Sequence, residues 1–354
     1  MQNKIVIKVQ TPSEFFVDFI NLAKRAKKRI WIQTMLFEAG INASILEQTL
    51  AVKLTKKEKP DVRIALDWVS SKAVHGKIGL LPEFKNNAYA TNLHRKTWKI
   101  LTRFKGKGIN VFINNKPNLI SLILPLFKRN HIKMYVVDNT AVWLGGVNFT
   151  DNSFTNTDFM VKFTGSKTVS KIASLYNIQN VKGNLKVVLN NGYIIYIDNG
   201  YCGRSIILKK ELQIISKAKK EILFISQFIP DGKVLEKFIR AAKKGVKVTV
   251  YTSNIEHRAF QEMPYKLFYI FFKYRIRYIP NFHLIHAKQK IHAKYLEIDK
   301  EKILFGSHNL IQSTVLLGTK EICVYARDKQ LSKSIRSKLN LSIEDTSVKR
   351  KGDK

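Results

Sequence analysis

A polar motif that occurs twice constrains this chain more than any other feature. Each copy starts with His-x-Lys, has an Asp seven residues after the His, a Gly seven residues further on and an Asn three residues beyond that Gly. The copies are His131, Lys133, Asp138, Gly145 and Asn148, and then His292, Lys294, Asp299, Gly306 and Asn309. Chance rarely matches three extra positions twice, so the chain contains a duplicated unit.

The sequence around the two motifs repeats in the same order. Residues 15–32 and 211–225 each predict a helix with a basic end that leads into a β-branched strand. A second buried strand is predicted at residues 62–67 in the first half and at 245–251 in the second. Alternating helices and buried strands predict an α/β fold, with a mixed sheet flanked by helices in each half.

The spacing of the motifs predicts two tandem domains. The motif histidines are 161 residues apart (292 minus 131), which is enough chain for a full domain. We predict a first domain at 1–190, a second at 191–345 and a basic tail at 346–354, with the boundary near the Gly- and Asn-rich stretch 190–203. Tandem copies most simply pack about a pseudo-two-fold axis, so we expect one active site at their interface.

The order of residues within a copy predicts that the His and the Lys act together. Residues i and i+2 of a strand point to the same face, and the residue between them would face the core. We predict that a β-hairpin carries each motif, with the motif aspartate bracing its turn more than contacting substrate. The motif glycines would let backbone approach a ligand, and the motif asparagines would donate hydrogen bonds to it.

The duplicated motif resembles the signature of the phospholipase D superfamily, in which the same series occurs twice. The likeness runs over nearly the whole chain and is greatest to bacterial cardiolipin synthases. Residues 130–138 (NHIKMYVVD) and 145–148 (GGVN) look like the first motif of those enzymes, and HAKYLEID with GSHNL fits the second. Asp158 and Gly165 match the Asp and Gly that follow in the family, while residues 319–321 (TKE) keep only the Glu of an Asn-x-Glu.

This resemblance implies a phosphodiesterase or phosphatidyltransferase that forms a phosphohistidine. One histidine attacks phosphorus, and the other protonates the leaving alkoxide and then activates the incoming hydroxyl. Following the usual order of the family, we assign His131 as the nucleophile and His292 as the acid, with no metal or other cofactor. The lysines and motif asparagines would hold the non-bridging oxygens. The candidate catalytic residues are His131, Lys133, Asp138, His292, Lys294 and Asp299, and the candidate substrate-binding residues are Asn148, Asn309, Gly145, Gly306 and Ser307.

The motif leaves the phosphodiester open between phospholipid and nucleic acid. The chain has 62 Lys and Arg against 26 Asp and Glu, and the net charge of +36 attracts either an anionic membrane or a polynucleotide. A general Lys-rich bias without a dedicated partner is the alternative explanation of this charge. Because of the Gly-Gly form of the first motif, the two copies in one chain and the aromatic-basic stretch 265–278, we predict phosphatidyl transfer that makes cardiolipin from phosphatidylglycerol or a related phospholipid. The alternatives are a phospholipase D and an endonuclease.

Two segments could contact a bilayer without crossing it. Residues 118–127 (NLISLILPLF) are shorter than the roughly twenty residues of a spanning helix. Residues 265–278 (YKLFYIFFKYRIRY) mix aromatics with cations, as interfacial elements do, or form a core helix and strand with snorkelling cations. The start of the chain does not have a signal-peptide pattern, and the lone Cys202 and Cys323 fit a reducing compartment. We therefore expect a cytoplasmic protein, bound peripherally to the inner face of the membrane.

Overall fold

The computed structural model describes residues 5–55, 58–71, 73–74, 77–78, 88–116, 128–178, 181–253 and 262–340. The apolar segment 118–127 and the predicted tail at 346–354 lie outside these residues.

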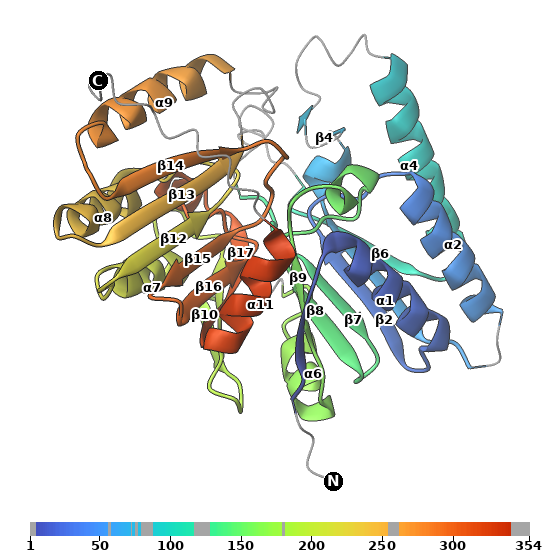
Figure 1. The fold of residues 1–354 in the computed structure, drawn as a ribbon. Coiled ribbons are helices and arrows are strands. Elements are labelled where there is room, and N and C mark those ends of the chain that lie inside the picture. The colour runs from blue at the N-terminus through green and yellow to red at the C-terminus, as the bar shows by residue number, and fades with distance from the viewer. Residues whose placement is uncertain are drawn as a thin grey trace.

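Within the described residues, the chain forms two mixed sheets, one in each half, that face each other across a shared apolar core (Figure 1). In spatial order, the strands of the first sheet are β1 (Ile7–Gln10), β9 (Met160–Phe163), β8 (Ala141–Gly145), β7 (Met134–Val137), β2 (Arg29–Thr34), β3 (Asp61–Asp67) and β6 (Asn110–Asn114). Those of the second sheet are β10 (Leu185–Val188), β11 (Ile194–Asn199), β17 (Lys320–Arg327), β16 (Lys302–Gly306), β15 (Tyr295–Ile298), β12 (Glu221–Ile225), β13 (Lys247–Ser253) and β14 (Phe282–Ala287). A short hairpin of β4 (Ala73–Val74) and β5 (Lys77–Ile78) stands apart from both sheets.

Six strands of each sheet correspond in order and direction. The parallel strands β2, β3 and β6 have their counterparts in β12, β13 and β14, and the antiparallel strands β7, β8 and β9 have theirs in β15, β16 and β17. This correspondence confirms the predicted α/β fold of two similar halves. The predicted boundary at 190/191 falls in the turn of the β10–β11 hairpin, and both strands of that hairpin belong to the second sheet. A tight turn and a linker share a Gly- and Asn-rich composition, so the sequence does not separate them.

Helices cover the outer face of each sheet (Figure 1). They are α1 (Pro12–Arg25), α2 (Ile41–Leu54) and α4 (Ala88–Gly106) on the first sheet, and α7 (Ile206–Ile215), α8 (Gly232–Lys243) and α9 (Glu262–Ile276) on the second. Between the halves lie α6 (Ser166–Ala173) and α11 (Lys329–Leu339), and the short α10 (Gln312–Leu316) follows the second motif. The described part of the chain includes no helix that is both long enough and apolar enough to span a bilayer.

Local sequence explains where the predicted helices begin. Thr11 and Glu14 form a reciprocal capping box at the start of α1, and Pro12 occupies its first turn. Ser205 caps α7 by accepting a hydrogen bond from the backbone N–H of Leu208 at 2.8 Å. Each helix then leads into the strand that pairs with its motif hairpin, so the repeated helix-strand plan places both motifs in the same way.

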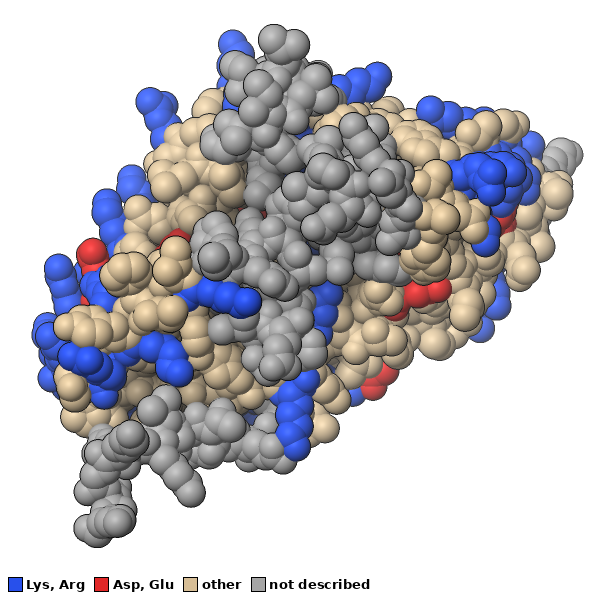
Figure 2. Space-filling model, turned by 90° about the horizontal axis from the view of Figure 1, so that it is seen from above, with Lys and Arg blue, Asp and Glu red and all other residues tan. Residues whose placement is uncertain are grey.

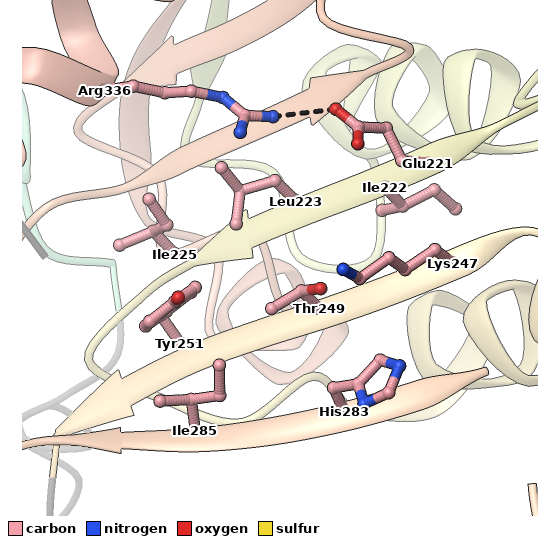
Figure 3. A pocket seen from close by; sticks show the side chains of 10 residues that line it. All are labelled: Glu221, Ile222, Leu223, Ile225, Lys247, Thr249, Tyr251, His283, Ile285 and Arg336. Atoms are coloured by element: carbon pink, nitrogen blue, oxygen red, sulfur yellow. Dashed lines mark hydrogen bonds and ion pairs between the residues drawn. The ribbon is translucent and has the colours of Figure 1, made fainter. Parts of the chain in front are cut away.

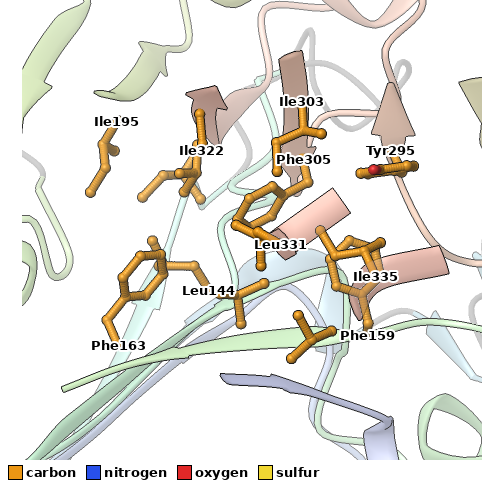
Figure 4. Close-up of a cluster of buried hydrophobic side chains, with 14 of the residues drawn as sticks. Leu144, Phe159, Phe163, Ile195, Tyr295, Ile303, Phe305, Ile322, Leu331 and Ile335 are labelled. Atoms are coloured by element: carbon orange, nitrogen blue, oxygen red, sulfur yellow. The ribbon is translucent and has the colours of Figure 1, made fainter. Parts of the chain in front are cut away.

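An apolar core joins the two sheets (Figure 4). Leu144 and Phe159 from the first half meet Tyr295 and Phe305 from the second, and all four side chains are buried. The ring centroids of Phe159 and Tyr295 are 6.1 Å apart, and the rings meet edge to face, an arrangement that aromatic pairs prefer. Two further cores lie under α1 and α2 and under α7 and α8. The halves therefore pack as one body, and groups at their junction are held by both.

Candidate active site

The two motif histidines lie at the junction because their backbone pairs with the opposite half. The N–H of His131 donates to the carbonyl oxygen of Lys320 at 2.9 Å, and the N–H of His292 donates to that of Thr157 at 2.9 Å. These bonds correct the prediction that each histidine lies within a strand. Strands β7 and β15 begin one residue after the motif lysine, because the preceding residues pair across the junction and not within their own sheet.

Each histidine ring is held by a carboxylate from the other half. Nδ1 of His131 lies 3.0 Å from Oε1 of Glu321, and it also lies 3.0 Å from the carbonyl oxygen of Ser307. Nδ1 of His292 lies 2.7 Å from Oδ2 of Asp158. The sequence indicates Glu321 and Asp158 only as positions of the resembled family and does not predict their contacts with the histidines. Sequence separations of 190 and 134 residues carry no local signal for these contacts.

These contacts determine which ring nitrogen is available for chemistry. A carboxylate accepts hydrogen bonds, so Nδ1 of each ring must carry the proton, which leaves the lone pair on Nε2. The side chains of His131 and His292 keep 13% and 12% of their surface exposed, so a substrate can reach them. The arrangement presents two imidazole nitrogens, one from each half, as a nucleophile and a proton carrier.

Burial also keeps both rings neutral. Burial lowers the pKa of His292 to about 3, with a further contribution from the charge of Lys294, and it lowers the pKa of His131 as well. Burial opposes ionisation of Glu321, but His131 and nearby cations outweigh it and bring the pKa of Glu321 down to about 2. At neutral pH the substrate-free site therefore holds uncharged imidazoles, the form needed for attack on phosphorus.

The two motif lysines form a buried cationic pair. Nζ of Lys133 donates to the carbonyl oxygen of His131 at 2.8 Å, and Nζ of Lys294 makes the same contact with His292. Burial lowers the pKa of Lys133 to about 7, with help from the charge of Lys294, and burial lowers the pKa of Lys294 to about 8. An ammonium group has three donors, so each lysine can also bind a phosphate oxygen. An anion between the two would relieve their mutual repulsion.

These pKa values predict an alkaline decline in activity. In the free enzyme, Lys133 and Lys294 lose their charge as the pH rises through about 7 and 8, so kcat/KM should fall in that range. A bound phosphate raises both lysine pKa values, so the decline in kcat should lie at higher pH. Initial rates measured as a function of pH and substrate concentration test the predicted declines in kcat/KM and in kcat. A kcat/KM that is flat up to about pH 9 would contradict a role for the lysine charges.

The motif aspartates lie at the hairpin turns, away from the histidine rings. The carboxylate of Asp138 accepts hydrogen bonds from the backbone N–H groups of residues 27–29, and that of Asp299 accepts them from residues 219–221. Both aspartates have a left-handed backbone, with φ of 52° and 55°. Both aspartates therefore brace the motif hairpin against the preceding helix-strand connection, as their spacing predicted. Their prediction as catalytic residues is wrong, because their carboxylates bind these backbone groups and not the reacting histidines.

Replacing Asp299 by alanine should therefore affect stability much more than chemistry. We expect the free energy of unfolding to fall by about 2 kcal/mol, because three backbone donors lose their acceptor and alanine tolerates the left-handed backbone poorly. Burial tends to raise the pKa of Asp299, but the three N–H donors lower it, so its stabilisation is present at neutral pH and lost on acidification. Urea unfolding, with Asp299→Asn as the matched control, measures the loss. A large drop in kcat with unchanged stability would refute the bracing role.

The motif glycines make room for neighbouring protein and not for a ligand, contrary to prediction. A Cβ on Gly145 would lie 2.4 Å from the carbonyl oxygen of Phe159, and one on Gly306 would lie 2.1 Å from that of Ile322. These contacts show that strands β9 and β17 pass too close for a side chain. Ser307, predicted to bind substrate, hydrogen-bonds through its hydroxyl to Glu321 and therefore helps to position His131.

The motif asparagines are buried on either side of the junction. Oδ1 of Asn148 accepts from the hydroxyl of Thr34 at 3.2 Å, so the group that Asn148 can offer a substrate is its amide N–H. Among the described residues, Oδ1 of Asn309 is a buried atom without a hydrogen-bond partner. No group of three or more His, Cys, Asp or Glu side chains within the described ranges is arranged to hold a metal ion.

A separate cavity of about 460 Å³ lies on the second sheet (Figure 3). It is lined by Glu221, Ile222, Leu223, Ile225, Lys247, Thr249, Tyr251, His283, Ile285 and Arg336. Glu221 and Arg336 form an ion pair along one edge, and Ile225, Tyr251 and Ile285 lie toward the carboxyl ends of β12, β13 and β14. The lining includes neither motif histidine and neither motif lysine, so this cavity is distinct from the candidate active site.

A known protein family matches both halves of the chain. The family model described as "Cardiolipin synthase, PLD-like domain" matches residues 19–177 and 212–341, one region in each half. The chain belongs to this PLD-like family. It is therefore an enzyme of the phospholipase D type, a phosphodiesterase or phosphatidyltransferase, as the resemblance of the duplicated motif implied.

The solved structures that share this fold include a phosphatidylserine synthase and a polyphosphate kinase. A phosphatidylserine synthase of Haemophilus influenzae Rd KW20 matches with a TM-score of 0.70 and 14% identity, covering 94% of this chain and 85% of the synthase. A polyphosphate kinase of Porphyromonas gingivalis matches with a TM-score of 0.57 and 12% identity, covering 95% of this chain but only 50% of the kinase. At these identities the matches show the fold alone. No curated protein matches this chain by sequence.

Proposed function

We propose that this protein is a phosphatidyltransferase that makes cardiolipin from phosphatidylglycerol, or from a related phospholipid, through a phosphohistidine. The observation that carries the proposal is the crossed arrangement at the junction, where each histidine is held by a carboxylate of the opposite half beside two buried lysines. This set supplies a nucleophile, an acid-base group and cations for a phosphodiester anion.

The reaction proceeds in two displacements at the same phosphorus. In the first, Nε2 of His131 attacks the phosphorus of one phosphatidylglycerol, and the bond from phosphorus to the glycerol headgroup oxygen breaks as His292 gives that oxygen a proton. In the second, His292 takes the proton from a hydroxyl of another phosphatidylglycerol, and the resulting alkoxide displaces His131. The products are cardiolipin and glycerol. Lys133 and Lys294 balance the negative charge of the non-bridging oxygens throughout.

His292 can act as an acid only if substrate binding makes its ring take up a proton. In the substrate-free site burial holds the pKa of His292 at about 3, so its ring is neutral at pH 7. A bound phosphodiester adds a negative charge next to the ring and raises this pKa, and Asp158 at 2.7 Å stabilises the imidazolium. Proton uptake by His292 is therefore coupled to substrate binding.

Two observations support a lipid as the substrate. The matching family model carries the description of cardiolipin synthase, and the fold match of highest TM-score given above is a phosphatidylserine synthase. We place the protein on the inner face of the membrane, with the anionic surface as its partner. Nucleic acid is the second candidate, because Lys and Arg side chains surround the upper face in Figure 2 and few acidic side chains are visible there.

Incubation of the purified protein with phosphatidylglycerol vesicles tests the proposal. Mass spectrometry should detect cardiolipin, and an enzymatic assay should detect one glycerol for each cardiolipin formed. Phosphatidic acid as the sole lipid product would instead identify a phospholipase D that transfers to water. Degradation of DNA or RNA by the same preparation, with vesicles left intact, would overturn the lipid function.

A further inference from the structure

Helix α9 exposes an unusual set of side chains. Its outward residues are Leu267 (57% exposed), Ile270 (62%), Phe271 (67%) and Tyr274 (61%), followed just beyond the helix by Tyr278 (81%). We call these five residues the α9 stripe. They stand three, four, seven and eleven positions after Leu267, a spacing that places them on one face of a helix. The predicted core packing of this segment therefore applies only to its opposite side.

The opposite face of α9 attaches the helix to the second sheet. Phe272 is buried and packs against Phe282 of β14, with ring centroids 6.0 Å apart. The hydroxyl of Tyr269 lies 2.6 Å from Nε2 of His286, also on β14. Strand β14 leads within five residues to His292, so α9 is fixed to the element that delivers the second catalytic histidine. Figure 1 shows α9 along the upper outer edge of the second half.

Cations border the stripe on both sides. Lys266, Lys273, Arg275 and Arg277 are all exposed, and at helical spacing they fall between the stripe and the buried face. The guanidinium of Arg277 lies 4.0 Å from the ring centre of Tyr274 and 4.4 Å from that of Tyr278. Residues 266–278 contain no Asp or Glu. Residues 266–278 thus form an apolar centre bordered by cations.

We propose that α9 docks the protein on an anionic phospholipid bilayer, with the α9 stripe at headgroup depth and the four cations on lipid phosphates. A bilayer surface is apolar beneath a layer of negative charge, which matches an apolar centre with a cationic border. A second copy of the helix would set cation against cation. A polynucleotide would leave Leu267 and Ile270 in water. The proposal deepens the proposed function, on which it rests for its lipid substrate.

Co-sedimentation with vesicles of phosphatidylcholine, alone or mixed equally with phosphatidylglycerol, tests the docking surface. The parent protein should bind the anionic vesicles. The triple variant Ile270→Ser, Phe271→Ser, Tyr274→Ser should lower the partition coefficient by about a thousandfold, because burying each of these side chains is worth about tenfold. The matched control is Ile41→Ser with Val52→Ser on α2, where the side chains are also exposed, and it should bind like the parent. Equal binding by the stripe variant and the parent would overturn the proposal.

A second pair of triple variants tests the contribution of the cations to vesicle binding. Lys273→Gln, Arg275→Gln and Arg277→Gln should weaken binding to anionic vesicles by about a hundredfold and reduce its salt dependence, since each surface cation contributes about fivefold. Arg240→Gln, Lys243→Gln and Lys244→Gln remove the same charge from the C-terminal end of α8 and its cap, and they should have a much smaller effect. Equal losses from the two triple variants would show that net charge and not α9 directs binding, and would overturn the proposal.

A further assay separates docking from catalysis. The stripe variant should retain its activity on phosphatidylglycerol in detergent micelles and lose it on vesicles, while its thermal unfolding by circular dichroism stays unchanged. If vesicle binding depends on the stripe but no preparation forms cardiolipin, docking stands and the proposed reaction fails. If the stripe variant instead changes the molar mass in light scattering and still binds vesicles, the surface contacts a second copy and the proposal is wrong.

Discussion

His131→Ala and His292→Ala should each lower kcat for phosphatidyl transfer by about 10⁴-fold or more. Both rings lie at the junction, each with Nδ1 tied to a carboxylate and Nε2 left for chemistry, so neither can replace the other. Cardiolipin formation from phosphatidylglycerol measures the loss. His283→Ala is the control, because this exposed ring on β14 belongs to the same half and lies outside the motif.

The two alanine variants should differ when the leaving group needs no proton. With a p-nitrophenyl ester of a phosphatidyl group, His292→Ala should still form the phosphohistidine on His131 and then accumulate it, because no base activates the incoming hydroxyl. Mass spectrometry of peptides kept at alkaline pH locates the adduct. His131→Ala should form no adduct. An adduct on His292 in that variant would reverse the assigned roles.

Glu321→Gln and Asp158→Asn should produce the second largest effect, a loss of about 10²- to 10⁴-fold in kcat with little change in stability. An amide of the same shape can present its N–H to Nδ1 and so favour the wrong tautomer of the ring. Because the pairs are crossed, the variant in each half disables the histidine of the other half. The ¹⁵N chemical shifts of the histidine rings report the tautomer directly.

The p-nitrophenyl ester should also distinguish the roles of Asp158 and Glu321. Asp158→Asn impairs the ring that gives the proton, so it should recover much of its rate of phosphoenzyme formation with a p-nitrophenyl leaving group. Glu321→Gln impairs the attacking ring and should not recover. Glu301→Gln, a partly exposed acid of the second half that pairs with Arg327, is the control. Equal recovery by both variants would show that these carboxylates only support the fold.

The sequence by itself determined the features that depend on short-range order. Strand and helix periodicity, the basic helix ends and the two copies of one motif predicted two similar α/β halves and one reaction class. The turn position of Asp138 and Asp299 also followed from their spacing, because a left-handed turn residue that braces a hairpin is a local feature.

Only the tertiary structure decided which groups meet at the junction. The contacts of Glu321 with His131 and of Asp158 with His292 arise because two sheets pack face to face over a shared apolar core, and no spacing along the chain encodes that packing. The same packing shows that Gly145 and Gly306 admit neighbouring strands. The outward direction of the α9 stripe was likewise undetermined by sequence, because a helix that is apolar on two opposite faces leaves its buried face to be selected by the sheet it covers.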